Sequence, residues 1–128
     1  MSLWWFRLGF STLLAHELDA VARAEWRVLP LTSFLPDQVG YIVFVLLHIP
    51  LVAVLLWLIS HPDLRLRRRS EFGISLFLVV HVGLHLAFMG HAHYDFHHGL
   101  SQLLIFGGGA LGLVHLLSLR LERQRAAS

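Results

Sequence analysis

Three long apolar segments of this 128-residue chain each carry a histidine at a similar depth, where an ionisable side chain is costly and usually lines a cavity or binds a ligand. These histidines are His16, His48 and His81. Each lies nine residues from the expected outer end of its segment, or about 13 Å along a helix. The ends used in this count are Glu25, Val39 and Gly90. Equal depth predicts that the three side chains meet inside one helix bundle.

Two neighbouring residues extend this set of potential metal ligands. His85 lies one helical turn from His81 on the same face, and Glu17 follows His16 directly. The chain has no cysteine, so a metal site must use imidazole and carboxylate groups, which suit Zn, Fe or Cu. We therefore expect a transition-metal site in which Glu17 is a ligand or a catalytic general base. Its expected ligands are His16, Glu17, His48, His81 and His85.

Six further residues are expected around this site. Asp19 lies at nearly the same level as His16 and either orients the His16 ring or forms an i,i+4 salt bridge with Arg23. A polar connector contributes the other five, which either are solvated or form an entry to the buried site. These five are His91, His93, Asp95, His97 and His98.

Two other functions fit the same histidines. Two of them could be axial ligands of haem b in an electron carrier, with His48 paired with His81 or His85. Alternatively, the histidines are structural and form hydrogen bonds between helices of a non-enzymatic membrane partner protein. His115, near the opposite end of its segment, is interpreted as structural.

The elements that position these residues are four apolar segments of about 20 residues each, enough to span a bilayer as helices. They cover residues 3–24, 39–59, 72–90 and 99–119, with a basic loop at 64–70. Hydrophobic residues make up 56% of the chain and charged residues only 14%, which favours a membrane protein. We expect one all-α domain over residues 1–128, a polytopic four-helix bundle. Gly108 and Gly112 have the spacing of a close helix contact.

The arginines predict the orientation of this bundle. Eight of the ten lie at one side of the expected bundle, which places both termini in the cytoplasm. They flank the apolar segments and form no nucleic-acid-binding stripe, so we expect no nucleic-acid partner. The expected partner is the lipid bilayer, with either a homo-oligomer or a complex with another membrane protein left open.

The chain also resembles a family of small uncharacterised bacterial membrane proteins, a domain of unknown function. The resemblance covers roughly the whole chain and includes residues 16–20 (HELDA), 25–27 (EWR), 29–30 (LP), 45–48 (VLLH) and 81–85 (HVGLH). It implies a compact four-helix membrane protein of bacterial origin, and hence a multi-pass protein of the bacterial inner (plasma) membrane. The resemblance implies no reaction.

Overall fold

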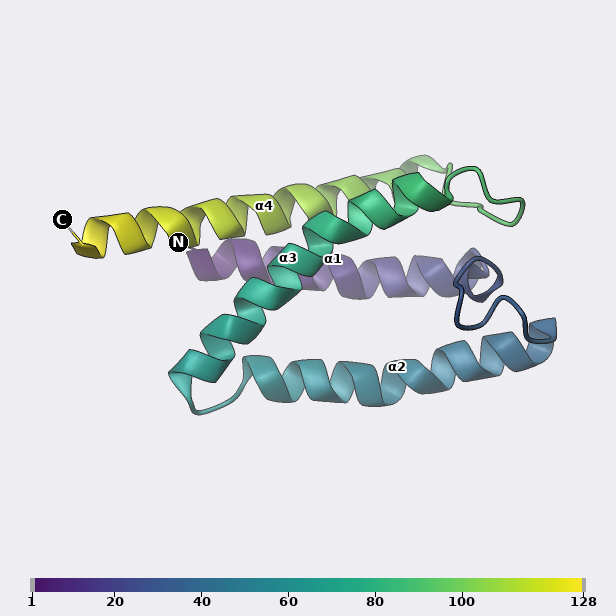
Figure 1. The fold of residues 1–128 in the computed structure, drawn as a ribbon, viewed down its shortest axis with the longest axis horizontal. Coiled ribbons are helices and arrows are strands. Elements are labelled where there is room, and N and C mark those ends of the chain that lie inside the picture. Colours follow the sequence, from purple (N-terminus) through teal and green to yellow (C-terminus); the bar gives the residue numbers. More distant parts are fainter. Residues whose placement is uncertain (1, 128) are drawn as a thin grey trace.

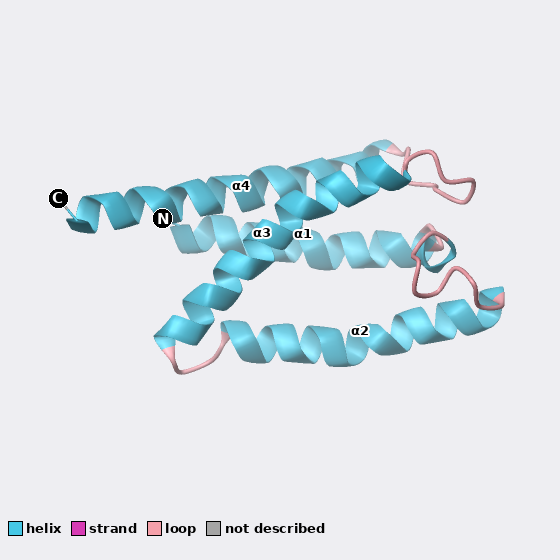
Figure 2. Ribbon diagram, viewed as in Figure 1, coloured by secondary structure: helices cyan, strands magenta, loops and turns pink. Residues whose placement is uncertain are grey.

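The computed structural model describes residues 2–127 and is all-helical, with no strand among these residues (Figure 2). This confirms the predicted all-α class with four long helices. The elements are α1 (Ser2–Ala22), the short 3-10 helix η1 (Glu25–Arg27), α2 (Asp37–Ile59), α3 (Leu64–Phe88) and α4 (Gly99–Ala127).

The four helices alternate in direction, so the N- and C-terminal ends lie at the same end of the molecule (Figure 1). Helix α4 packs along both α1 and α3, whereas α2 packs mainly on α3, which crosses diagonally between them. A Cβ added at Gly112 of α4 would lie only 2.6 Å from the carbonyl oxygen of Ser75 in α3. The backbones of α3 and α4 therefore touch here, as the spacing of Gly108 and Gly112 predicts.

Two helices extend beyond the apolar segments that predicted them. Residues 64–70, expected as a basic loop, form the first turns of α3, because the Asp63 side chain accepts a hydrogen bond from the Arg65 N–H at 2.8 Å and caps the helix. Helix α4 continues past Leu119 to Ala127. The added turns are rich in arginine, leucine and glutamate, which favour helix. Hydropathy detects only the apolar part of a helix, so it did not indicate these charged turns.

The first helix ends earlier than expected, at Ala22, and the chain then turns back on itself. Ala24 adopts the left-handed conformation at φ 53°, which is uncommon for a residue other than glycine. The turn is held by the Trp26 indole N–H and the Arg27 guanidinium, both of which donate to the carboxylate of Asp37. This places Glu25 inside the bundle, whereas the sequence analysis took it as the outer end of a helix.

Within residues 2–127, three helices, α2, α3 and α4, are long and apolar enough to cross a membrane. Four spans were expected, but α1 is more polar because it carries Arg7, Glu17 and Asp19. Helix α2 buries very little of its apolar surface inside the chain, so most of its side chains face outward. That distribution is typical of a helix surrounded by lipid or by another apolar partner.

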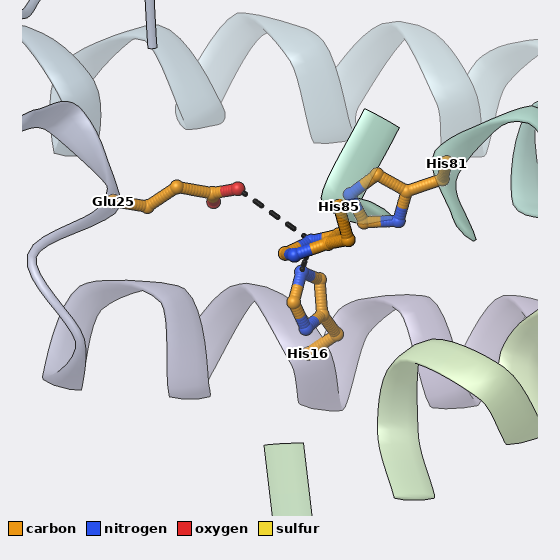
Figure 3. Close-up of side chains that lie close together, drawn as sticks. All are labelled: His16, Glu25, His81 and His85. Carbon is orange, nitrogen blue, oxygen red and sulfur yellow. Dashed lines mark hydrogen bonds and ion pairs between the residues drawn. The ribbon is translucent and has the colours of Figure 1, made fainter. Parts of the chain in front are cut away.

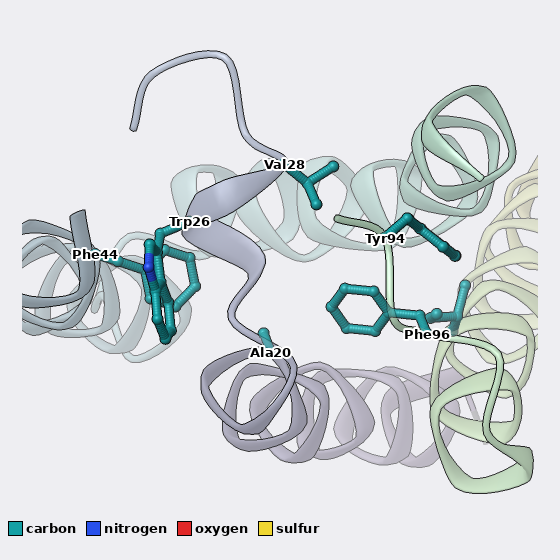
Figure 4. Close-up of a cluster of buried hydrophobic side chains, with 7 residues drawn as sticks. Ala20, Trp26, Val28, Phe44, Tyr94 and Phe96 are labelled. Carbon is teal, nitrogen blue, oxygen red and sulfur yellow. The ribbon is translucent and has the colours of Figure 1, made fainter. Parts of the chain in front are cut away.

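A hydrophobic core closes the end of the bundle where the turn after α1 meets the connector between α3 and α4 (Figure 4). Its aromatic residues come from both connecting segments and from α2. The buried members are Ala20, Trp26, Val28, Phe44, Tyr94, Phe96 and Ile105. This core anchors both connectors directly over the histidines.

Candidate metal centre

Three imidazole rings converge between α1 and α3 (Figure 3). The ring centroid of His16 lies 4.9 Å from that of His81 and 5.0 Å from that of His85, and the latter two are 4.6 Å apart. His81 and His85 are neighbours because residues four apart on a helix share a face. His16 and His85 are almost completely buried, at 1% and 5% exposure.

Glu25 supplies a carboxylate to the same point (Figure 3). Its Oε1 lies 3.8 Å from Nε2 of His85, which in turn lies 3.3 Å from Nε2 of His16. One potential ligand atom from each of His16, Glu25, His81 and His85 lies within 4.8 Å of all the others. Two ligands bound tetrahedrally to Zn²⁺ at their usual distances lie about 3.3–3.4 Å apart. The His16–His85 spacing already matches this value, so small shifts of the other two would complete a site.

The environment of Glu25 is unfavourable for a lone carboxylate. Burial raises the pKa of Glu25 to about 7, and the nearby Glu17 carboxylate acts in the same direction. Among the described residues, nothing hydrogen-bonds to the buried Nδ1 of His16. A bound cation would offset the cost of burying this carboxylate beside three imidazoles that cannot all be charged together.

The connector between α3 and α4 completes the surroundings of the cluster. The Tyr94 hydroxyl lies 3.1 Å from Nδ1 of His85, and the Phe96 ring packs against both His85 and His16. Burial raises the pKa of Tyr94, so its hydroxyl remains protonated. A cavity of about 60 Å³ lies beside Glu25, His81 and His85, which is room for one or two water molecules.

Two of the five expected ligands lie outside this group. Nε2 of His48 is 2.8 Å from Oε2 of Glu17, and Nδ1 of His48 donates to the Phe44 carbonyl at 2.6 Å. These two residues therefore form a separate, half-buried pair between α1 and α2. His16 and His81 lie together, as their equal depth predicts, but His48 does not join them, because α2 packs mainly on α3 and η1 and the His48 side chain meets Glu17 instead.

Of the two roles predicted for Asp19, the i,i+4 salt bridge with Arg23 is observed. Asp19 accepts a hydrogen bond from the Ser101 hydroxyl at 2.6 Å and lies 3.4 Å from the Arg23 guanidinium, so it ties α1 to α4. Arg23 also lies 3.4 Å from Asp95. The connector histidines are exposed, and they are His91, His93, His97 and His98. The connector covers the cluster through Tyr94 and Phe96 instead.

Glu25 and Tyr94 are two polar residues at the cluster that the sequence analysis did not select as site residues. For Glu25 the available signal was an acidic residue just after an apolar segment, but its inward position depends on the turn at Ala24. For Tyr94 the signal was a single aromatic residue in a histidine-rich connector. His115, interpreted as structural, is buried and lies 2.7 Å from the Ser75 hydroxyl through its Nδ1.

A comparison with models of protein families found a match for this chain. A model described as a family of unknown function, DUF6713, matches residues 2–122. The chain belongs to this family. The match confirms the resemblance to an uncharacterised domain family, and DUF6713 carries no assigned reaction. No curated protein and no solved structure matches the chain.

Proposed function

We propose that this protein is a multi-pass protein of the bacterial inner membrane that binds one transition-metal ion through His16, Glu25, His81 and His85. The observation that carries the proposal is the convergence of four potential ligand atoms within 4.8 Å at a buried point. Three imidazoles and one carboxylate form a ligand set that suits Zn²⁺, Fe²⁺ or Cu²⁺. The eight-to-two distribution of arginines supports an orientation with both termini in the cytoplasm.

The surroundings of the ligands support an ion over the two alternatives. A haem needs a pocket of the size usual for cofactors, about 300–1,000 Å³, whereas the cavity at the histidines measures about 60 Å³. His48, the expected axial partner, is engaged with Glu17. His115, which joins α3 and α4, has a hydrogen-bond partner in Ser75, whereas three imidazoles and a carboxylate share one point at the cluster.

The position of Tyr94 supports the same proposal. Histidine ligands of metals usually donate their second ring N–H to an oxygen acceptor, which fixes the tautomer and the ring orientation. Nδ1 of His85 faces the Tyr94 hydroxyl at 3.1 Å, while Nε2 faces His16 and Glu25. In our proposal, His85 binds the ion through Nε2 and donates Nδ1–H to Tyr94.

The test is the metal content of the protein, purified in detergent without chelators and without a histidine tag, and measured by mass spectrometry. We expect about one Zn²⁺ per chain after loading and dialysis, and a large loss of bound Zn²⁺ in His85→Ala and Glu25→Gln. His48→Ala is the matched control, because His48 lies in the membrane region but outside the group.

Retention of Zn²⁺ by His48→Ala together with its loss from His85→Ala would support the proposed ligand set. A wild-type protein that retains no Zn²⁺, Fe²⁺ or Cu²⁺ would refute the proposal and favour structural histidines. Equal losses in His48→Ala and His85→Ala would place the site on a different set of ligands.

A further inference from the structure

A second polar feature lies outside the metal centre, in a groove formed by α1, α2 and α3. The groove has a volume of about 320 Å³, and its walls are almost entirely aliphatic or aromatic. Leu13 lines it from α1, Leu51 and Leu55 from α2, and Phe77 from α3. The only polar side chains among its lining residues are Glu17 and His48.

The Glu17–His48 pair has a defined proton arrangement. Nδ1 of His48 is 2.6 Å from the Phe44 carbonyl, which can only accept, so Nδ1 carries a proton. The 2.8 Å contact between Nε2 and Oε2 of Glu17 then holds one further proton. Whether that proton resides on the imidazole or on the carboxyl group, the pair has no net charge. Both of its protons are engaged, one with the Phe44 carbonyl and one between the two side chains, so the free lone pairs of the Glu17 carboxyl group can only accept hydrogen bonds. About a quarter of each side chain remains exposed.

We propose that this groove binds a single-chain neutral lipid whose hydroxyl headgroup donates a hydrogen bond to the Glu17 carboxyl group of the Glu17–His48 pair. The hydrocarbon lining fits an alkyl chain, and the volume corresponds to about ten methylene-sized groups, taking ~30 Å³ for each. A pair without net charge gives an ionic headgroup no electrostatic advantage, whereas leaving an exposed polar pair against hydrocarbon is costly. A hydroxyl group at the head of the chain carries no charge and supplies the hydrogen-bond donor that the carboxyl oxygens of the pair can accept.

This site is distinct from the metal centre. Phe77 lines the groove and also stacks on His81, with ring centroids 5.2 Å apart, so the two sites share a wall. The cavity beside the metal centre is lined by Glu25, His81 and His85, none of which lines the groove. The lipid proposal therefore does not depend on metal binding.

The structure provides a matched pair of glycines for the test. Gly73 lines the groove, and a Cβ added there meets no atom within 4 Å, so Gly73→Leu extends a side chain into the groove without a backbone clash. Gly83 lies on the same helix and has equally open space at its Cβ, but it does not line the groove. Gly83→Leu controls for the change in helix propensity.

The experiment is photolabelling of the full-length protein in detergent with a dodecanol analogue that carries a diazirine in its chain, followed by mapping of the labelled peptides. The same diazirine in dodecane and in dodecanoate tests the headgroup. We expect labelling of groove residues, about five- to tenfold stronger for the alcohol than for the hydrocarbon or the carboxylate, since one net hydrogen bond contributes about that factor. Gly73→Leu should reduce labelling at least fivefold, and Gly83→Leu should leave it unchanged.

Removal of the headgroup partner gives a second measurement. In the double variant Glu17→Leu/His48→Phe, alcohol labelling should fall to the level of the hydrocarbon, while hydrocarbon labelling persists and reports that the groove is still formed. His85→Ala should leave alcohol labelling intact, which separates this proposal from the metal site. Equal labelling by alcohol and hydrocarbon in the wild type, or unchanged labelling in Gly73→Leu, would overturn the proposal.

Discussion

Replacing Tyr94 by Phe tests the metal centre through one atom that is not itself a ligand. The Tyr94 hydroxyl lies 3.1 Å from Nδ1 of His85, and Tyr94 is only 7% exposed. Phe keeps the ring that packs on Phe96 and His85 and removes the hydrogen bond that fixes the His85 tautomer. Loss of such a partner typically lowers metal affinity by about 10–100-fold, or about 1.4–2.7 kcal/mol.

The assay is competition for Zn²⁺ between the detergent-solubilised protein and a chromophoric chelator of known affinity. We expect a 10–100-fold weaker Zn²⁺ affinity in Tyr94→Phe, and a loss of about 1 kcal/mol in the unfolding free energy of the metal-free protein. Tyr41→Phe is the control, because Tyr41 lies in α2 and its ring packs on Trp26 of η1 instead of on His85. A Tyr94→Phe protein with the same Zn²⁺ affinity as wild type would show that His85 is not a ligand held through Nδ1, and the reasoning would be refuted.

Three further predictions concern stability in detergent. Gly112→Ala should lower the free energy of unfolding by about 1–3 kcal/mol, measured by thermal melting, because its Cβ would meet the Ser75 carbonyl, whereas Gly107→Ala, with 4.0 Å to its nearest neighbour, should not. Ser75→Ala should cost about 1–3 kcal/mol by leaving the buried His115 ring nitrogen without its partner; an unchanged melting temperature would contradict this. Burial raises the Glu25 pKa from 4.5 to about 7, so the folded metal-free protein binds the Glu25 proton more tightly than the unfolded chain does. The stability that this proton contributes is therefore fully present below pH 4.5 and is lost as the pH rises through about 7. Glu25→Gln should flatten that part of the pH–stability curve, and an equally steep curve in the variant would assign the slope to another group.

The sequence predicted the helices well because hydropathy and segment length determine them directly. It placed the start of α3 about eight residues late, since residues 64–70 are polar on average yet favour helix once Asp63 caps them. It predicted four membrane spans, whereas three of the described helices are long and apolar enough to cross a membrane. The difference is α1, in which charged residues interrupt the apolar segment. Hydropathy reports where a helix is apolar, and helix ends depend on capping and propensity.

The candidate site could be predicted only in part, because depth in a bundle does not specify lateral distance. His16, His81 and His85 were selected because histidines inside apolar segments are costly, and they do lie together. His48 was selected by the same argument but lies on α2, which packs mainly on α3 and on the turn after α1. Glu25 reaches the cluster only because Ala24 adopts a left-handed conformation and reverses the chain. Such a turn depends on tertiary contacts, which a residue pattern does not encode.

The most direct test of the central claim is X-ray absorption spectroscopy at the zinc edge of the Zn²⁺-loaded wild-type protein. The proposed ligand set predicts four nitrogen or oxygen ligands at about 2.0–2.2 Å, with the outer-shell scattering of three imidazole rings. In Glu25→Gln the imidazole scattering should remain while zinc occupancy falls, because the anionic ligand is lost but the three rings stay in place. A spectrum with fewer than three imidazoles, or a shell of six oxygen ligands, would contradict the claim that His16, His81 and His85 bind the ion together.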